Sequence, residues 1–203
     1  MKKFMKSLLL LMVFLLVFST SAFAKSENAK PFLVALGDSI PYGYNLGQTN
    51  ASPSQEAFPY LMGKEADLRV RNLGVPGATT EDLLDALKND QKYRQAVRHS
   101  DYITLNIGNN DLLRALGRAA EESENDEKKF EYLLQKYINE SGVFTNLQQI
   151  IMEIERLTDS PVIIYNIYNP FDKNDFKERE LHVIAERILP GLNVINRMAI
   201  QFR

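Results

Sequence analysis

The sequence contains no cysteine and only two histidines among its 203 residues. The absence of cysteine excludes a disulfide framework, a thiolate zinc site, an iron–sulfur cluster and a cysteine nucleophile. The formal net charge is only -2, and Lys and Arg are scattered, so no basic face is expected to neutralise nucleic-acid phosphates. We therefore expect one globular domain without a nucleic-acid partner, whose chemistry uses other residue types.

The N-terminus has the order of a secretory signal peptide. Lysines within the first six residues precede an apolar run from Leu8 to Phe18, and Ala22 and Ala24 form a small-x-small cleavage site. The run is shorter than the roughly 20 apolar residues of a membrane-spanning helix. We expect a signal peptide over residues 1–24, a domain over residues 25–203, and a secreted or extracytoplasmic location. With no cysteine for lipid attachment, no stable membrane anchor is expected after cleavage.

Short apolar runs alternate with segments of helical spacing along the rest of the chain. The predicted strands are 32–36, 69–73, 101–107 and 161–168, and helical spacing covers 58–66, 80–87, 130–137, 143–157 and 181–202, with a break or restart at Pro190. This alternation predicts an α/β fold, a three-layer sandwich with a central parallel sheet.

Polar clusters follow three of the predicted strands. They are Asp38 and Ser39, the turn from Gly74 to Gly77, and the turn from Gly108 to Asp111. Ligands of parallel sheets bind at the carboxyl ends of the strands, so we expect these loops to meet at one edge. There a serine is a candidate nucleophile, and a backbone N–H of the second loop with a side-chain amide of the third, preferably that of Asn110, are candidate oxyanion donors. Each loop taken singly also fits a simple turn.

These residues resemble the sequence blocks of the GDSL or SGNH hydrolases. FLVALGDSIPYGY (residues 32–44) is similar to their nucleophile block, NLGVPGATT (72–80) to their glycine block, and IGNND (107–111) to their G-x-N-D block. The resemblance implies an SGNH/flavodoxin-like fold and a serine esterase or acylhydrolase that needs no cofactor and no metal. Its substrate would be a small-molecule, lipid or glycan ester.

The resemblance also implies the roles of individual residues. Ser39 would be the nucleophile that forms an acyl-serine intermediate, and Gly77 and Asn110 would donate hydrogen bonds in the oxyanion hole. The adjacent Asp38 and Asp111 would support the site.

A fourth family block, Asp-x-x-His, is missing from this sequence. Ala96 stands three residues before His99, and Arg179 three residues before His182, so neither histidine matches. His99 precedes a strand and is expected at the opposite end of the sheet, and His182 is expected on a last helix packed against a sheet face. The chain therefore resembles a family member truncated before its last strand and helix, with the catalytic His and Asp absent and the activity impaired.

Two alternatives use the same sequence differently. A noncatalytic glycan-binding module would keep the sheet edge as a pocket, with stacking surfaces from Tyr42, Tyr44, Tyr165, Tyr168 and Phe171, although core and pocket lining are the commoner roles of such side chains. A metallohydrolase has little support, because no H-E-x-x-H motif is present. The charged segment 118–140 suggests a further hypothesis, a lid over the pocket.

Overall fold

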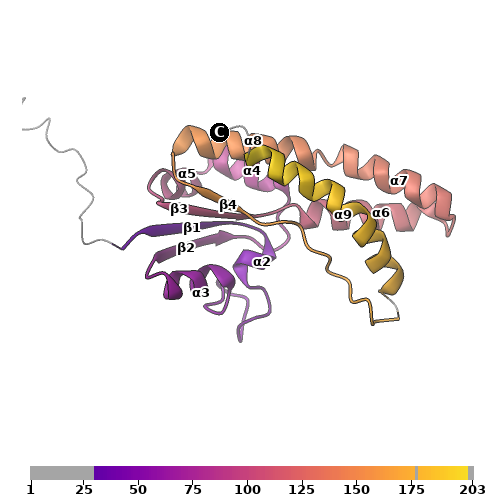
Figure 1. Cartoon of the computed structure of the whole chain (residues 1–203), viewed down its shortest axis with the longest axis horizontal. Helices are drawn as coiled ribbons and strands as arrows, with labels where there is room; N and C mark the ends of the chain where they lie inside the picture. The colour runs from indigo at the N-terminus through magenta and orange to yellow at the C-terminus, as the bar shows by residue number, and fades with distance from the viewer. Residues whose placement is uncertain (1–29, 177, 201–203) are drawn as a thin grey trace, which may run out of the picture. The chain divides into compact units, whose positions relative to one another are not determined.

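A four-stranded parallel sheet organises the fold (Figure 1). Its spatial order is β2-β1-β3-β4, with bounds β1 Phe32–Gly37, β2 Arg69–Gly74, β3 Tyr102–Asn106 and β4 Val162–Ile164. The computed structural model describes residues 30–176 and 178–200, so the predicted signal peptide lies outside the described residues. The predicted α/β class with a central parallel sheet is confirmed, and its first three strands begin and end within one residue of the predicted bounds.

The fourth strand is shorter than predicted. The sequence predicts a strand over 161–168, but pairing with β3 ends at Ile164, followed by one more main-chain hydrogen bond from Tyr165 N to Leu105 O at 2.9 Å. Beyond it, the side chain of Asn193 takes both main-chain groups of Ile167, accepting from its N–H and donating to its C=O, each at 2.9 Å. These bonds from a later helix replace the ladder that would have extended the strand.

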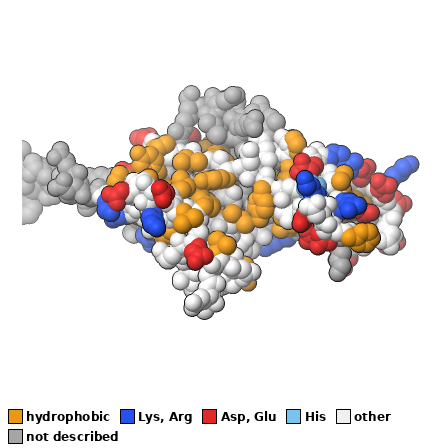
Figure 2. All heavy atoms as spheres, turned by 60° about the horizontal axis from the view of Figure 1, so that its bottom comes forward, with side chains coloured by type: hydrophobic (Ala, Val, Ile, Leu, Met, Phe, Trp, Pro, Cys, Tyr) orange, Lys and Arg blue, Asp and Glu red, His pale blue; other side chains and the backbone are white. Residues whose placement is uncertain are grey.

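One face of the sheet carries the main hydrophobic core. Val34 and Leu36 of β1 and Ile103 and Leu105 of β3 point to this face and are fully buried. Three helices cover them, α4 Thr80–Asn89, α5 Gln91–Arg98 and α8 Val143–Leu157 (Figure 1). The alternate residues of β1 point to the other face, where α2 Ser39–Tyr42 and α3 Phe58–Glu65 lie. Figure 2 looks onto this second face and shows hydrophobic side chains gathered near its middle.

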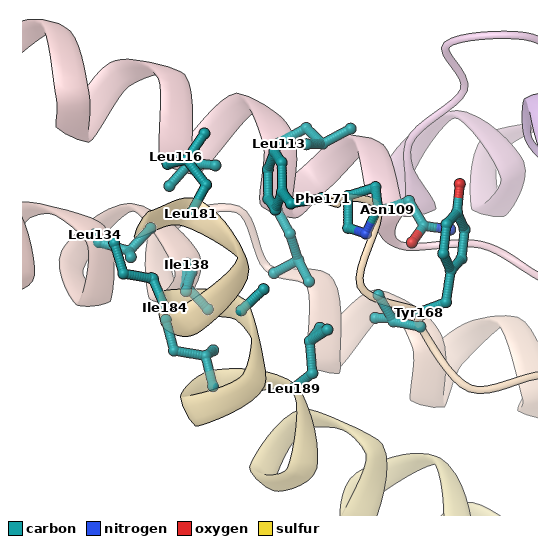
Figure 3. A pocket seen from close by; sticks show the side chains of 15 residues that line it. Asn109, Leu113, Leu116, Leu134, Ile138, Tyr168, Phe171, Leu181, Ile184 and Leu189 are labelled. Carbon is teal, nitrogen blue, oxygen red and sulfur yellow. The ribbon is translucent and has the colours of Figure 1, made fainter. Parts of the chain in front are cut away.

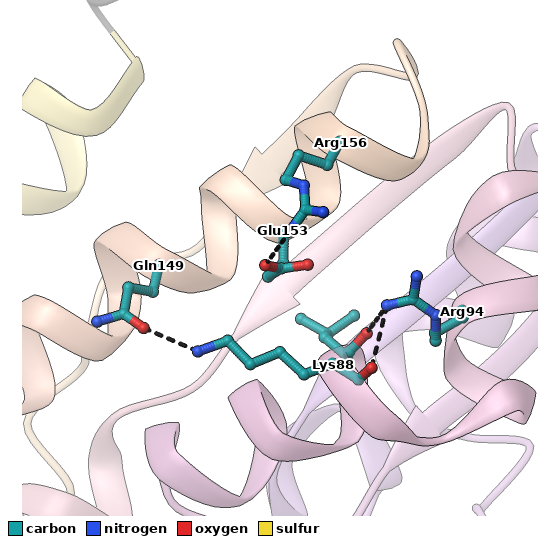
Figure 4. A network of polar contacts seen from close by, with 6 residues as sticks. Lys88, Arg94, Gln149, Glu153 and Arg156 are labelled. Carbon is teal, nitrogen blue, oxygen red and sulfur yellow. Dashed lines mark hydrogen bonds and ion pairs between the residues drawn. The ribbon is translucent and has the colours of Figure 1, made fainter.

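Polar contacts fasten α4 to its neighbours (Figure 4). Lys88 donates to Gln149 of α8 at 2.9 Å. Arg94 of α5 donates to the main-chain oxygens of Leu87 at 2.9 Å and Lys88 at 3.1 Å. The last carbonyls of a helix have no partner within it, so Arg94 satisfies two groups that α4 leaves open. These bonds hold the C-terminal end of α4, whose N-terminus lies at the carboxyl edge of the sheet.

A second helical layer lies beside this core. It consists of α6 Asn109–Ser123, α7 Glu127–Glu140 and α9 Arg179–Ile200. The hydrophobic contacts of α6 and α7 include Ala119 and Leu133, and Ile184 and Ile188 of α9 pack against them. The sequence did not predict that α6 begins directly after β3. Within the described residues, no helix combines the length and the apolar character that crossing a membrane requires.

Two expectations for the last helix are wrong. Pro190 lies inside α9 and neither ends nor restarts it. Proline removes only one main-chain hydrogen bond, while Ile188 and Leu189 beside it still pack against the α6–α7 layer. The described first half of α9 also packs on that helical layer rather than on a face of the sheet, because its apolar residues complete the cluster between α6 and α7.

Candidate active site

Ser39 lies where β1 ends and α2 begins. Gly37 closes the strand with φ 146°, and a Cβ there would lie 1.9 Å from the main-chain oxygen of Asn106, so only glycine fits. Asp38 caps the short helix by accepting from Ile40 N at 2.9 Å. Ser39 is therefore the first residue of α2, half-buried at the carboxyl end of the sheet.

The loop after β2 lies against this position. Val75 N donates to the Gly37 carbonyl at 3.0 Å, which joins the first two loops. Gly77 is exposed and has a φ of 80°, a backbone conformation that residues other than glycine rarely adopt. Arg114 of α6 donates to the Gly77 carbonyl at 3.1 Å and so fixes the orientation of this turn.

The loop after β3 joins the other two. Asp38 N donates to Asn106 O at 3.3 Å, and Asn109 Nδ2 lies 3.4 Å from Asp38 Oδ2. Asn110 donates from its side-chain amide to Ala78 O at 2.8 Å. An amide nitrogen carries two N–H groups, so this bond leaves Asn110 a second donor for a ligand. Each pair of the three predicted loops is thus connected by at least one hydrogen bond, at the switch point between β1 and β3 where the strand order reverses.

A buried polar network positions Asn110. The next residue, Asp111, accepts from Thr80 N at 3.0 Å and from Thr80 Oγ1 at 2.6 Å. Asn146 of α8 donates to the same hydroxyl at 3.2 Å. Asp111 and Thr80 are both buried, so these bonds satisfy groups that water cannot reach. The network ties the N-terminus of α6 to that of α4, and with them the second and third loops.

The carboxyl groups of Asp38 and Asp111 are both buried, and both have raised pKa values. Burial raises the pKa of Asp38, against hydrogen bonds from Ile40 and Asn109 that lower it, and the charge of Asp111 raises it further. Burial likewise raises the pKa of Asp111, against the two bonds from Thr80. Both carboxylates accept hydrogen bonds that hold the loops together, and their supporting role in catalysis stays a prediction.

Neither histidine is held at this site. His99 caps the C-terminus of α5 ahead of β3, at the opposite end of the sheet from Ser39, as expected, and its Nδ1 lies 2.7 Å from Gln95 O. His182 lies on α9 with Nδ1 2.8 Å from Phe171 O and 3.1 Å from Asn169 Nδ2. The hydrogen bonds of its ring thus go to the segment that follows β4. The structure brings together the loops of Ser39, Gly77 and Asn110, and their catalytic roles stay predictions.

Three residues of this arrangement were not predicted from the sequence, Arg114, Thr80 and Asn146, whereas Asn109 lies in the predicted third loop as the less favoured amide. Arg114 follows Asn110 by one helical turn, so the two positions share a helix face, and a predicted helix starting at residue 109 would have revealed it. Thr80 and Asn146 gave no local signal, because their partners lie on other helices: Thr80 binds Asp111, and Asn146 binds Thr80.

The aromatic side chains of the glycan-binding alternative have different surroundings. Tyr165 packs against Phe58 of α3 with ring centroids 4.8 Å apart. Tyr168 and Phe171 line an apolar cavity between helices (Figure 3), and Tyr42 donates its hydroxyl to Asn50 O at 2.6 Å. Tyr44 is about half exposed. Core or pocket lining thus describes Tyr165, Tyr168 and Phe171, but not Tyr44.

Fold and site together define a parallel α/β protein with a serine at the topological switch point of its sheet. The chain belongs to the GDSL-like lipase/acylhydrolase family, because the model of that family matches residues 35–189. A relative in Bacillus subtilis (strain 168), named "Uncharacterized protein YpmR", is 30% identical over an alignment of 180 residues that covers 82% of this chain and 65% of the relative. The chain therefore spans about 65% of the length of the curated relative that it matches.

A solved structure shares the fold. The lipase Lip_vut3 from a goat rumen metagenome matches with a TM-score of 0.56 and 23% identity, over 82% of this chain and 74% of that one. This likeness shows that the two proteins share the overall fold. Together with the family match, it confirms the predicted membership of the GDSL/SGNH hydrolases.

Proposed function

We propose that this protein is an extracytoplasmic serine esterase or acylhydrolase that cleaves carboxylic esters through an acyl-serine intermediate. Ser39 Oγ attacks the ester carbonyl carbon, the new oxygen–acyl bond forms, and the alcohol leaves with a proton. Water then attacks the acyl-serine, which releases the carboxylic acid and restores the serine. Backbone N–H groups of Gly77 and Ser39 and the amide of Asn110 donate to the oxygen that becomes negative.

One observation carries the proposal. The three loops that bear Ser39, Gly77 and Asn110 come from positions up to 71 residues apart, and hydrogen bonds join each pair of them at the switch point. These bonds bring the three loops to one edge of the sheet, where a nucleophile and its oxyanion donors would have to lie close together. The family match supports the reaction class, since its description names lipases and acylhydrolases.

The rate that we propose for this chain depends on whether a side chain is available as the general base. The sequence has two histidines, and the hydrogen bonds of both rings go to other parts of the chain. When catalytic-triad members are removed from serine hydrolases, the oxyanion hole and substrate binding still accelerate the reaction about 10³- to 10⁴-fold over water. We therefore propose slow, Ser39-dependent turnover by the 203-residue chain.

Chemical rescue tests this proposal directly. Hydrolysis of p-nitrophenyl acetate is followed at high protein concentration, with and without added imidazole, which supplies a diffusing general base. We expect imidazole to accelerate the wild-type protein beyond its effect on the ester alone. Ser39→Ala should show no such acceleration, and Asn110→Ala should reduce the protein-dependent rate by about 10²-fold.

The matched control is Asn139→Ala, which removes an exposed amide of α7 and should keep the wild-type rate. Equal rates in wild type and Ser39→Ala would overturn the nucleophile. A fast rate without imidazole that disappears in His182→Gln would instead make His182 the base and overturn the proposed slow turnover.

The extracytoplasmic location rests on the signal-peptide pattern of residues 1–24. Expression of the full chain in a secreting bacterium should yield an exported product whose N-terminal residue is Lys25. A product that stays in the cytoplasm with Met1 or Lys2 at its N-terminus would contradict it.

A further inference from the structure

Two side chains of α6 hold consecutive carbonyl groups of the turn after β2. Asn110 and Arg114 lie one helical turn apart and therefore share a helix face. Asn110 donates to Ala78 O at 2.8 Å, and Arg114 Nη2 donates to Gly77 O at 3.1 Å. The helix that carries one candidate oxyanion donor, the Asn110 amide, thus also holds the turn that carries another, the Gly77 N–H.

The turn presents the Gly77 N–H without a bond of its own. Ala78 N donates to Val75 O at 3.1 Å and Gly77 has a φ of 80°, which together fit a type II turn with Pro76 and Gly77 at its centre. The Gly77 N–H belongs to the middle peptide of such a turn. Within the described residues it has no hydrogen-bond partner, so it is free to bind a ligand.

Few contacts restrain the tip of this turn. Val75, Pro76 and Gly77 are all exposed, and a Cβ at Gly77 would meet no heavy atom within 4 Å. Among the described residues, Arg114 provides the only side-chain hydrogen bond to these three residues. An exposed segment with few contacts opens locally at little cost in free energy, so the position of the turn depends strongly on this bond.

We infer that Arg114 is a positioning residue of the oxyanion hole, which holds the Gly77 turn against α6 so that the Gly77 N–H and the Asn110 amide converge on one oxygen atom. The inference rests on the proposed ester hydrolysis and extends its machinery to a side chain that does not touch the substrate. Donors stabilise a developing oxyanion only when they are preorganised around it. A guanidinium suits this role, because it is always charged and its donors have a fixed geometry.

Phenylboronic acid tests the oxyanion hole without turnover. Ser39 Oγ adds to the boron, a proton is released to water, and the boron becomes tetrahedral and negatively charged, with a boron-bound hydroxyl in the place of the oxyanion. Titration followed by boron NMR separates trigonal from tetrahedral boron and gives the dissociation constant. A donor displaced by about 1 Å can reduce a rate about 100-fold, so we expect Arg114→Met to raise this constant by about 10- to 100-fold.

Hydrolysis of p-nitrophenyl acetate at a fixed imidazole concentration gives a second measurement. An interaction made only in the transition state affects kcat and leaves KM nearly unchanged. Arg114→Met should therefore lower kcat by about 10- to 100-fold and change KM by less than about twofold.

Arg118→Met is the matched control. Arg118 lies one turn further along α6, is exposed like Arg114, and its guanidinium lies 3.9 Å from the centre of the Tyr137 ring rather than on the turn. Both variants lose one positive charge, but Arg118→Met should bind phenylboronic acid within about twofold of wild type. The effect of Arg114→Met should persist in about 1 M KCl, because salt screens the charge of an exposed side chain but does not restore a displaced donor.

Glycine-labelled NMR spectra report on the turn itself. The chain has ten glycines, and the signal absent from Gly77→Ala identifies the Gly77 N–H. Saturation with phenylboronic acid should shift this signal in wild type and in Arg118→Met, and shift it much less in Arg114→Met. Arg114→Gln, whose side chain is shorter, should behave as Arg114→Met and keeps the test decisive if that variant does not fold.

The outcomes separate this inference from the proposed function. No tetrahedral adduct in wild type, or an adduct that Ser39→Ala also forms, would overturn the proposed nucleophile. A Ser39-dependent adduct with the same affinity in wild type and Arg114→Met would overturn the role of Arg114 alone. A loss of affinity that Arg118→Met shares, or one that disappears in concentrated KCl, would assign the effect to charge and contradict the positioning role.

Discussion

Thr80 holds the buried network together, and Thr80→Val removes its hydroxyl while keeping the shape of the side chain. The hydroxyl donates to Asp111 Oδ1 at 2.6 Å and accepts from Asn146 at 3.2 Å. A hydrogen bond to a charged group contributes about 1.5–3 kcal/mol, and a neutral one about 0.5–1.5 kcal/mol. Thr80 is fully buried, so water cannot replace either partner. We expect Thr80→Val to lower the free energy of unfolding by about 2–4 kcal/mol.

The cost of this substitution should depend on pH. Burial already raises the pKa of Asp111, so wild-type stability falls as the pH rises through that pKa. The Thr80 hydroxyl favours the charged carboxylate, and its removal raises the pKa of Asp111 further. The loss of stability with rising pH is therefore greater in the variant, and the difference from wild type should be larger at pH 7 than at pH 4.

Urea unfolding followed by far-UV circular dichroism at both pH values measures this effect. Thr145→Val, at an exposed position of α8, is the matched control and should stay within about 0.5 kcal/mol of wild type. Thr80→Ser keeps the hydroxyl and should recover most of the lost stability. A Thr80→Val protein as stable as the control, or a difference that does not change with pH, would refute the assigned network.

Two further predictions concern the loops around the site. Gly37→Ala places a Cβ 1.9 Å from Asn106 O and should lower the free energy of urea unfolding by more than about 3 kcal/mol, because strain at the positive φ adds to the clash. The control Gly117→Ala, in the open middle of α6, should instead raise the free energy of unfolding by about 0.5–1 kcal/mol. Equal effects of the two substitutions would contradict this reasoning. The Thr79 N–H lowers the pKa of exposed Asp82 below its ordinary value of 3.8, so the capping box stabilises above that pH and its contribution is lost as the pH falls through the lowered pKa. Asp82→Asn should therefore cost about 0.5–1 kcal/mol at pH 7 and progressively less as the pH falls below 3.8, and a cost that does not decrease in acid would disprove the ionic part of the cap.

The sequence alone predicts much of the fold, for a physical reason. Short apolar runs such as 32–36 can bury both faces only in a covered parallel sheet, and regular helical spacing needs a sheet or another helix to cover it. These are local properties, so the first three strands and most helices can be predicted from the local sequence. In the same way, polar residues directly after predicted parallel strands predict that their loops meet at one edge of the sheet.

Contacts between distant residues decide what the pattern could not show. β4 ends early because Asn193 takes the main-chain groups of Ile167, and α9 continues through Pro190 while its apolar residues pack on another layer. Neither event has a local signature, since each depends on a partner brought near only by folding.

The candidate site divides in the same way. The sequence by itself determined which residue types stand at the strand ends, and so the three loops of Ser39, Gly77 and Asn110. Only the tertiary structure decided how they are held, through the bonds of Asp111 to Thr80 and of Arg114 to Gly77, and which apolar faces of α6, α7 and α9 line the apolar cavity between these helices. Residue type and spacing are properties of the sequence itself, whereas hydrogen-bond partners and cavities form only when distant segments pack together.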